Sequence, residues 1–264
     1  MTNFADLARS HLPADTADRL LALLRPAIQL SIAQDDQPVV GRLGGAADLP
    51  EGAPWPVGLN SHPLSLVATL DCARLAAYEA DIELPGDGEL LFFVEFEGVG
   101  DAVIYVPAGT PTLRRSEGWV HPEESLTART VLTWPENAQP ELDEAFGGGS
   151  AVFEAVWRQM SAGRAFMEVV EEYGLRHHGS RHQVGGHAMV LQSPFEAVAA
   201  ERQGAGWYDE ESFYAEARQW VLLLQLEETE QMGWGDGGHI IWGIRRDHLA
   251  ARDFSKTLFD LQSH

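Results

Sequence analysis

The sequence predicts an α+β fold that is internally duplicated, with a mainly antiparallel sheet and a few flanking helices. Three landmarks occur twice in the same order: a double-glycine motif, an apolar run, and a Gly-Asp-Gly turn that leads into a second apolar run. Short strands and hairpins dominate over alternating βαβ units, which favours antiparallel pairing. The paired landmarks are residues 42–45 and 183–186, 64–70 and 220–226, and 86–94 and 235–243.

The N-terminal segment is predicted to be helical. Leucines recur at helical spacing through residues 3–25, Pro13 divides the stretch into two helices, and Pro26 ends the second because proline has no amide hydrogen. Apolar and polar residues then alternate over 27–32, as in a half-buried strand. Further strands are expected at 64–70, 89–96, 102–106 and 126–134, with a helix that Asp71 caps and that continues to about Ala80.

A linker is expected between the two halves. It is rich in Pro, Glu and Gly and ends in Gly-Gly-Gly-Ser, which favours a flexible connection. The second half should contain helices over 151–173, 208–219 and 247–254 and strands over 220–226 and 239–244. The predicted division is a helical segment (1–25), a first repeat (26–135), a linker (136–150) and a connecting helix with the second repeat (151–264), both repeats forming one globular unit.

The chain is strongly acidic. Its 264 residues include 18 Lys and Arg against 40 Asp and Glu, giving a formal net charge of −22. A surface of this sign repels phosphate backbones and anionic lipid, so neither nucleic acid nor a membrane is an expected partner. The charge favours solubility, and it also suits a basic protein partner.

Cysteine usage and the N-terminus indicate a cytoplasmic protein. Cys72 is the one cysteine, which excludes an intrachain disulfide and a thiolate-rich zinc site. The preceding Asp71 should raise the pKa of the thiol, so no catalytic role is expected for it. The N-terminus lacks the basic and apolar regions of a secretory signal, and no apolar stretch approaches the ~20 residues that a membrane-spanning helix needs.

Several motifs in a fixed order resemble the YwqG-like family, a bacterial domain of unknown function. The resemblance joins an opening glycine motif, a second glycine motif that begins at His182, and a C-terminal signature. The matching segments are Leu-Gly-Gly at 43–45, Leu-Pro-Glu-Gly at 49–52, Trp-Pro at 55–56, His-Gln-Val-Gly-Gly at 182–186, Leu-Leu-Gln-Leu at 223–226, Trp-Gly-Asp-Gly-Gly at 234–238 and Arg-Asp-Phe-Ser at 252–255.

The resemblance covers residues 26–262 and implies a cytosolic, duplicated α+β protein with no established activity. Family members encoded beside toxin systems imply an accessory or immunity role. The chain departs from the family's pattern after Leu226, where Glu227 and Glu228 stand in place of an expected aspartate. The family supplies no catalytic residues to carry over to this sequence.

A group of histidines is the first candidate for chemistry, because imidazoles bind zinc, copper or nickel. Their spacing does not fit a helical His-x3-His pair. If residues 184–191 form a strand, His182 and His187 face opposite sides of it. We therefore expect no metal and no cofactor, and expect His182 to hydrogen bond to the backbone turn that follows it. The group consists of His177, His178, His182 and His187.

Asp87 and Asp236 occupy the same place in the two Gly-Asp-Gly turns. An aspartate between glycines commonly accepts a hydrogen bond from an amide of its own turn, which stabilises the turn. Alternatively, one carboxylate from each half faces a shared cleft, as general acid–base chemistry requires. The turn interpretation is favoured because the residue recurs with the turn.

Tryptophans near the two glycine motifs are the third candidate. Trp55 lies between two prolines on a stiff loop, and Trp234 lies beside the second Gly-Asp-Gly turn. Together with Phe92, Phe93 and Trp242 they would form either an aromatic binding groove or part of the core. Core packing is the more common use of such large apolar surfaces.

Two function classes remain, because the common phosphate-loop, zinc-protease and serine-hydrolase signatures are absent from the sequence. The leading hypothesis is a cytosolic, acidic binding protein, of the accessory or immunity type, that contacts a basic protein. The alternative is an enzyme or small-ligand-binding protein with its cleft at the junction of the two repeats. The candidate binding residues are Trp55, Asp87, His182, Trp234 and Asp236.

Overall fold

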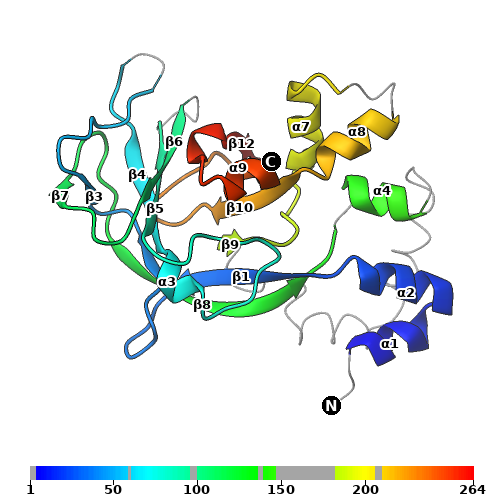
Figure 1. Ribbon diagram of the computed structural model, residues 1–264. Coiled ribbons are helices and arrows are strands. Elements are labelled where there is room, and N and C mark those ends of the chain that lie inside the picture. The colour runs from blue at the N-terminus through cyan, green and yellow to red at the C-terminus, as the bar shows by residue number, and fades with distance from the viewer. Residues whose placement is uncertain (1–3, 59–60, 96–99, 136–138, 147–181, 206–209) are drawn as a thin grey trace.

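The computed structural model describes most of the chain (Figure 1). The helix expected over 151–173 and the histidines His177 and His178 lie outside the described residues. The described residues are 4–58, 61–95, 100–135, 139–146, 182–205 and 210–264.

One large antiparallel sheet dominates the molecule. Its ten strands follow the order β12-β11-β10-β9-β1-β8-β2-β4-β5-β6, and a separate pair joins β3 to β7. The expected mainly antiparallel sheet is confirmed. The strands are β1 (Arg25–Ile32), β2 (Gly41–Leu43), β3 (Ala47–Pro50), β4 (Ser65–Asp71), β5 (Glu89–Val94), β6 (Asp101–Val106), β7 (Thr112–Arg115), β8 (Glu124–Thr133), β9 (His182–Val184), β10 (Trp220–Glu227), β11 (His239–Arg245) and β12 (Leu258–Gln262).

Short helices flank the sheet. Several gather on one side of it, to the right in Figure 1, while α9 lies near its C-terminal edge. The two predicted N-terminal helices are present, and Pro13 divides them. The described helices are α1 (Phe4–His11), α2 (Ala14–Ala22), α3 (Cys72–Leu75), α4 (Pro140–Phe146), α7 (Phe195–Arg202), α8 (Glu210–Ala217), α9 (Arg246–Ala250) and the 3-10 helix η1 (Phe254–Lys256).

The sheet has two flanks of matching strand order around a central β1–β8 pair. Strands β9, β10, β11 and β12 follow on one side, and β2, β4, β5 and β6 follow on the other. Each flank begins with a strand that leads into a double glycine of positive φ, at 44–45 and at 185–186. The register of the next strand pair shifts at Leu66/Ala68 in one flank and at Leu222/Leu224 in the other.

The sheet is nearly closed, because its two ends approach each other and share one core. The rings of Phe92 on β5 and Trp242 on β11 meet edge to face at 5.1 Å, and both side chains are fully buried. The indole Nε1 of Trp242 donates a hydrogen bond to the Asp101 carboxylate of β6 at 3.2 Å. Burying these rings removes a large apolar area from water and joins the two flanks.

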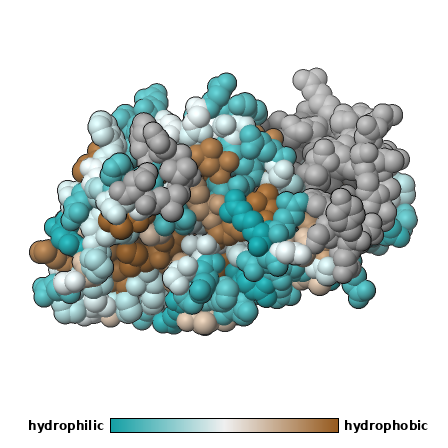
Figure 2. All heavy atoms as spheres, turned by 90° about the horizontal axis from the view of Figure 1, so that it is seen from above, coloured by the Kyte–Doolittle hydropathy of each residue, from teal (hydrophilic) through white to brown (hydrophobic). Residues whose placement is uncertain are grey.

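Hydrophilic residues cover much of the surface seen from above, and hydrophobic patches lie among them, mostly in the left half of the view (Figure 2). A few large apolar side chains are exposed among the described residues, a common feature of folded proteins. The most exposed is Trp119, at 65%; the others are Ile32, Val57, Leu113 and Val120.

Local structure differs from the sequence predictions at several places. Helix α2 ends at Ala22, and Pro26 lies within β1 rather than at the end of that helix. Residues 27–30 of β1 are all buried, so burial does not alternate there as expected. The strand considered over 184–191 is wrong, because Gly185 and Gly186 take positive φ and turn the chain after β9. The helix after β4 ends at Leu75, although Asp71 caps it as expected, accepting a hydrogen bond from the Arg74 amide at 3.0 Å. Helix α4 lies within the range expected to be a linker.

Candidate functional site

Trp55 belongs to the core. Its indole Nε1 donates to the Leu64 carbonyl at 2.8 Å, and its ring meets Phe93 edge to face at 5.4 Å. The Arg115 guanidinium lies 5.8 Å from the ring centroid, in cation–π contact. With 7% of its surface exposed, Trp55 presents little area to a ligand.

Trp234 is buried as well. Its Nε1 donates to the Glu227 carbonyl at 3.3 Å, and its ring packs in the main core cluster together with Trp242 and Phe92. The aromatic residues considered as a groove are therefore core residues in this structure.

His182 has a structural hydrogen bond, but its described partner differs from the expected turn. Its Nδ1 accepts from the Glu227 amide of β10 at 3.1 Å. Burial lowers the pKa of His182 to about 4, because the charged imidazolium would lose its hydration. The ring is therefore neutral at physiological pH, and its hydrogen bond ties β9 to β10.

Asp87 is exposed, and its side chain contacts Tyr105 on β6. The Tyr105 hydroxyl donates to its carboxylate at 2.9 Å. The Arg252 guanidinium lies over the same ring, 5.5 Å from the centroid, and its Nη1 donates to the hydroxyl oxygen at 3.4 Å. Asp87 thus holds the Tyr105 ring, and the Tyr105 ring in turn contacts the Arg252 guanidinium.

Asp236 is also exposed, and the amide of His264 donates to its backbone carbonyl at 3.1 Å. Within the described residues, neither the Asp236 carboxylate nor that of Asp87 accepts a bond from an amide of its own turn. The prediction of such a bond is wrong. At Asp87 the carboxylate accepts a hydrogen bond from the Tyr105 hydroxyl instead, and at Asp236 the backbone of the C-terminal residue His264 bonds to the turn. No described contact joins the two carboxylates.

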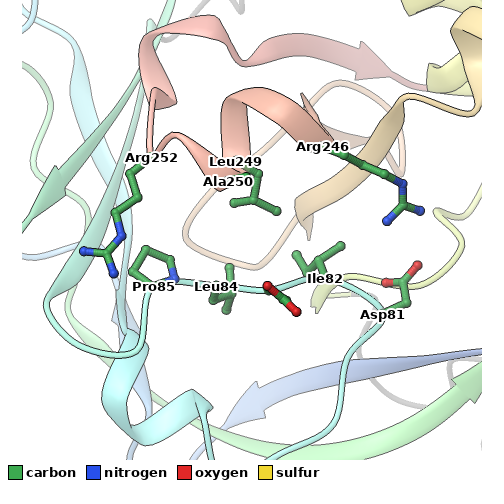
Figure 3. Close-up of a pocket in the computed structure, with 9 residues that line it drawn as sticks. Asp81, Ile82, Leu84, Pro85, Arg246, Leu249, Ala250 and Arg252 are labelled. Atoms are coloured by element: carbon green, nitrogen blue, oxygen red, sulfur yellow. The ribbon is translucent and has the colours of Figure 1, made fainter.

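A cleft of about 420 Å³ lies where the two flanks of the sheet meet (Figure 3). One wall is the segment of residues 81–85, here called the strap, which connects α3 to β5. The other wall is α9 with the residues after it. Such a volume is typical of small-ligand sites. The lining residues are Asp81, Ile82, Glu83, Leu84, Pro85, Arg246, Leu249, Ala250 and Arg252.

The strap is fixed at its first residue. The Asp81 amide donates to the Pro26 carbonyl at 3.0 Å, and the Asp81 carboxylate accepts from the Gly186 amide at 2.6 Å. The Arg25 guanidinium lies 3.7 Å from the second carboxylate oxygen. The charge of Asp81 is therefore already paired, although its side chain lines one end of the cleft (Figure 3).

The opposite wall carries two arginines. Arg246 lies at the Asp81 end and Arg252 at the Pro85 end, with Leu249 and Ala250 between them (Figure 3). Arg252 has φ of 56°, a left-handed conformation that costs a non-glycine residue about 1 kcal/mol or more. The left-handed backbone and the contact with Tyr105 together restrict the orientation of the Arg252 side chain.

Arg246 is the free cation of the cleft. Its side chain has no hydrogen bond or ion pair with any residue in the described part of the chain, and it is exposed. Arg246 and Asp81 face each other (Figure 3), but no ion pair within 4.0 Å joins them. A guanidinium with open donors beside an apolar surface suits a carboxylate, which it can bind with two parallel hydrogen bonds.

A smaller cavity of about 220 Å³ shares Ile82, Leu84 and Pro85 with the cleft and also contacts Cys72. The Cys72 thiol is buried, and burial together with Asp71 raises its pKa to about 12. Such a thiol stays protonated at neutral pH and is a poor nucleophile.

A cleft at the junction of two repeats was the alternative prediction, and none of the five candidate binding residues lines the cleft described here. The strap alternates in sequence, Asp-Ile-Glu-Leu-Pro, and this pattern was available as a signal of an extended, half-exposed segment. Arg252 opens the last motif of the C-terminal signature. Arg246 belongs to none of the sequence motifs, and it lies close to the strap only in the folded structure.

Two features are missing from the residues that the structure describes. None of their helices has the length and apolar character to cross a membrane. No group of three or more His, Cys, Asp or Glu side chains among them is arranged to hold a metal ion. The cleft itself offers two carboxylates and two guanidiniums.

The fold and the cleft define a sheet-dominated protein whose two sheet flanks meet around a small-ligand-sized cleft. The chain belongs to the family described as Domain of unknown function (DUF1963), whose model matches residues 41–263. The matched range includes both walls of the cleft. No curated protein matches the chain.

Proposed function

We propose that this protein is a ligand-binding protein that holds a small molecule with a carboxylate group in the cleft between the strap and α9. The observation that carries the proposal is Arg246, a guanidinium with no described partner in a cavity of about 420 Å³. A ligand carboxylate would gain charge-assisted hydrogen bonds there, and its apolar part would cover Leu249, Leu84 and Pro85.

Binding without catalysis is favoured by the state of Cys72, which lines the adjacent smaller cavity, and of His182, which lines neither cavity. The Cys72 thiol has a pKa raised to about 12, and the His182 ring is buried and bonded to a backbone amide. Neither group is poised as a nucleophile with a positioned base, which covalent catalysis requires.

The proposal is tested by thermal unfolding with octanoate and with octanamide, its neutral analogue. At ten times its Kd, octanoate should stabilise the protein by about 1.4 kcal/mol, which raises Tm by about 3 °C. Arg246→Gln should abolish the shift. Arg19→Gln should keep it, because Arg19 is also exposed and without a described ion pair but lies on α2. An octanoate shift that survives in Arg246→Gln, or no shift at all, would refute the proposal.

An internal duplication would explain the geometry of the cleft, and we infer one. Its support is the matching strand order of the two flanks, the positive φ at both double glycines, and the register shift in the corresponding strand pair of each flank. Three of the YwqG-like motifs fall on these elements: Leu-Gly-Gly at 43–45, His-Gln-Val-Gly-Gly at 182–186 and Leu-Leu-Gln-Leu at 223–226. A bacterial, cytosolic setting fits the single, buried, free cysteine.

A second candidate is a surface for a basic protein partner, in an accessory or immunity role. It is favoured by the net charge of −22 and by the exposure of Trp119, since tryptophan is enriched at interface hot spots. Affinity capture from lysate should recover a basic protein that 0.5 M salt releases, and Trp119→Ala should weaken the capture. Recovery of no basic protein under several growth conditions would contradict it.

A further inference from the structure

We propose that the ligand of the cleft is a short free peptide, bound in an extended conformation along the strap as an added strand. This inference rests on the proposed function and names the chemical class of its ligand. It starts from the backbone of the strap rather than from the side chains of the cleft.

The strap offers unpaired backbone hydrogen-bonding groups. Among the described residues, none donates to or accepts from the backbone of Ile82, Glu83 or Leu84. On either side of them the pattern changes, because the Asp81 amide is bonded to Pro26 and Pro85 has no amide hydrogen. In an extended segment alternate residues direct their N–H and C=O groups to the same side, so an extended peptide in the cleft can pair with the free groups of Ile82 and Leu84 or with those of Glu83.

The length of this segment sets the length of the ligand. A peptide strand that runs along three residues is itself about three residues long, or about 10 Å at 3.3 Å per residue. Asp81 and Arg246 mark one end of the cleft and Pro85 and Arg252 the other (Figure 3). The cavity of about 420 Å³ accordingly suits a short peptide rather than a long segment of a protein.

The free guanidinium of Arg246 gives the bound peptide a direction, because Arg252 at the other end is already in contact with Tyr105. A strand antiparallel to the strap starts near Pro85 and ends near Asp81, where Arg246 has open donors. Its terminal carboxylate would then meet the Arg246 guanidinium. The side chains of the peptide would alternate, so that some of them cover the apolar surface of Leu249 and Leu84.

A fatty acid or another simple carboxylate would use Arg246 and the apolar wall in the same way. It would leave the backbone of the strap unpaired, however, and would not exploit the free N–H and C=O groups of Ile82, Glu83 and Leu84. The peptide backbone is therefore the feature that separates this inference from the broader proposed function.

The test is native mass spectrometry of the full chain with a pool of tripeptides built from Ala, Val and Leu with free termini. Two matched pools carry either a C-terminal amide or a methyl group on both peptide nitrogens, which removes both peptide N–H donors. Octanoate serves as the carboxylate without a peptide backbone. Each titration is repeated on Arg246→Gln and on the control Arg19→Gln.

We expect the free tripeptides to bind about tenfold more tightly than octanoate, the amide and the N-methylation each to weaken binding about tenfold, and Arg246→Gln to remove the effect of the amide. Binding of octanoate through Arg246 with no gain for tripeptides, or with no penalty for N-methylation, would overturn the peptide inference and leave the proposed function standing. Binding of neither probe would overturn both.

Discussion

The two double-glycine turns of this protein share a backbone conformation and differ in what surrounds them. Gly44 and Gly45 have φ of 59° and 77°, and Gly185 and Gly186 have φ of 69° and 70°. A Cβ atom on Gly45 would meet the Glu123 carboxylate at 2.3 Å, the far end of a side chain that is 47% exposed. The neighbour of Gly45 can therefore move, whereas a Cβ atom on Gly44 would meet the backbone oxygens of Pro122 and His121 at 2.3 and 2.8 Å.

The second turn is enclosed. A Cβ atom on Gly186 would lie 2.5 Å from the Thr133 hydroxyl and 2.7 Å from the Ala27 methyl group, and neither can move away easily. Around this turn lies a network of ionisable groups that are largely buried. It joins Asp81, Arg25, Glu141 and His187 through ion pairs.

The double-glycine turn therefore has different surroundings and a different role at its two positions. At the first turn, the second glycine, Gly45, faces the surface charge of Glu123, so this position is open although Gly44 is buried. At the second turn the same shape lets the Gly186 amide hold Asp81, and with it the first residue of the strap. The second turn thus supports the cleft, whereas the first does not contact it.

The largest predicted effect separates Gly186→Ala from Gly45→Ala. Both residues would take on the left-handed strain of about 1–2 kcal/mol, and Gly186→Ala would add about 1–3 kcal/mol for overpacking. We expect the free energy of unfolding to fall by about 3–4 kcal/mol for Gly186→Ala and by about 1–2 kcal/mol for Gly45→Ala. Urea unfolding followed by tryptophan fluorescence measures both.

Gly204→Ala is the matched control for this pair. Gly204 has φ of 87°, and a Cβ atom there would meet nothing within 4 Å, so the substitution reports the left-handed strain alone. Gly45→Ala should resemble it. An equal loss of stability for Gly45→Ala and Gly186→Ala would break the distinction between an open and an enclosed turn.

Much of the fold could be predicted from the sequence, because the central strands are continuous apolar runs. The runs at 64–70 and 220–226 became β4 and β10, and the Gly-Asp-Gly turns lead into β5 and β11. Strands β2, β3 and β7 are three or four residues long, too short for a periodic signal. Their positions depend on pairing with segments distant in sequence.

The residues of the candidate site could not be predicted from the sequence, which offered a cleft between two halves only as an alternative. The matching landmarks indicated a junction between two halves, and the cleft lies where the two flanks meet. Its two walls are separated by about 160 residues in sequence, so no local pattern links Asp81 to Arg246. Trp55 and Trp234 were candidate binding residues because tryptophan is suited to a binding groove, but it is equally suited to a core, where both residues lie.

The smallest predicted effect concerns pH and a buried carboxyl near the second turn. Glu196 on α7 accepts from Gln139 at 3.4 Å, and its other oxygen has no partner in the described part of the chain. Burial, with the nearby Glu141, raises the pKa of Glu196 from 4.5 to about 8. The folded chain therefore holds a proton that the unfolded chain releases above pH 4.5.

Because the folded state binds more protons, this group lowers the stability as pH rises from about 4.5 to about 8, by up to about 1.4 kcal/mol per pH unit. Glu196→Gln keeps the neutral shape and should remove this slope, so the variant gains over the wild type as pH increases. The window from pH 6.5 to 8 avoids His182, which lowers stability only as pH falls below 6.5. Urea unfolding across that window measures the difference.

Glu123→Gln at the first turn is the control, since Glu123 is half-exposed and joined to Arg114 at the surface. It should keep the wild-type slope between pH 6.5 and 8. If Glu196→Gln also kept that slope, the carboxyl would be ionised in the folded state. The second turn would then tolerate a buried charge, and its contrast with the open first turn would rest on packing alone.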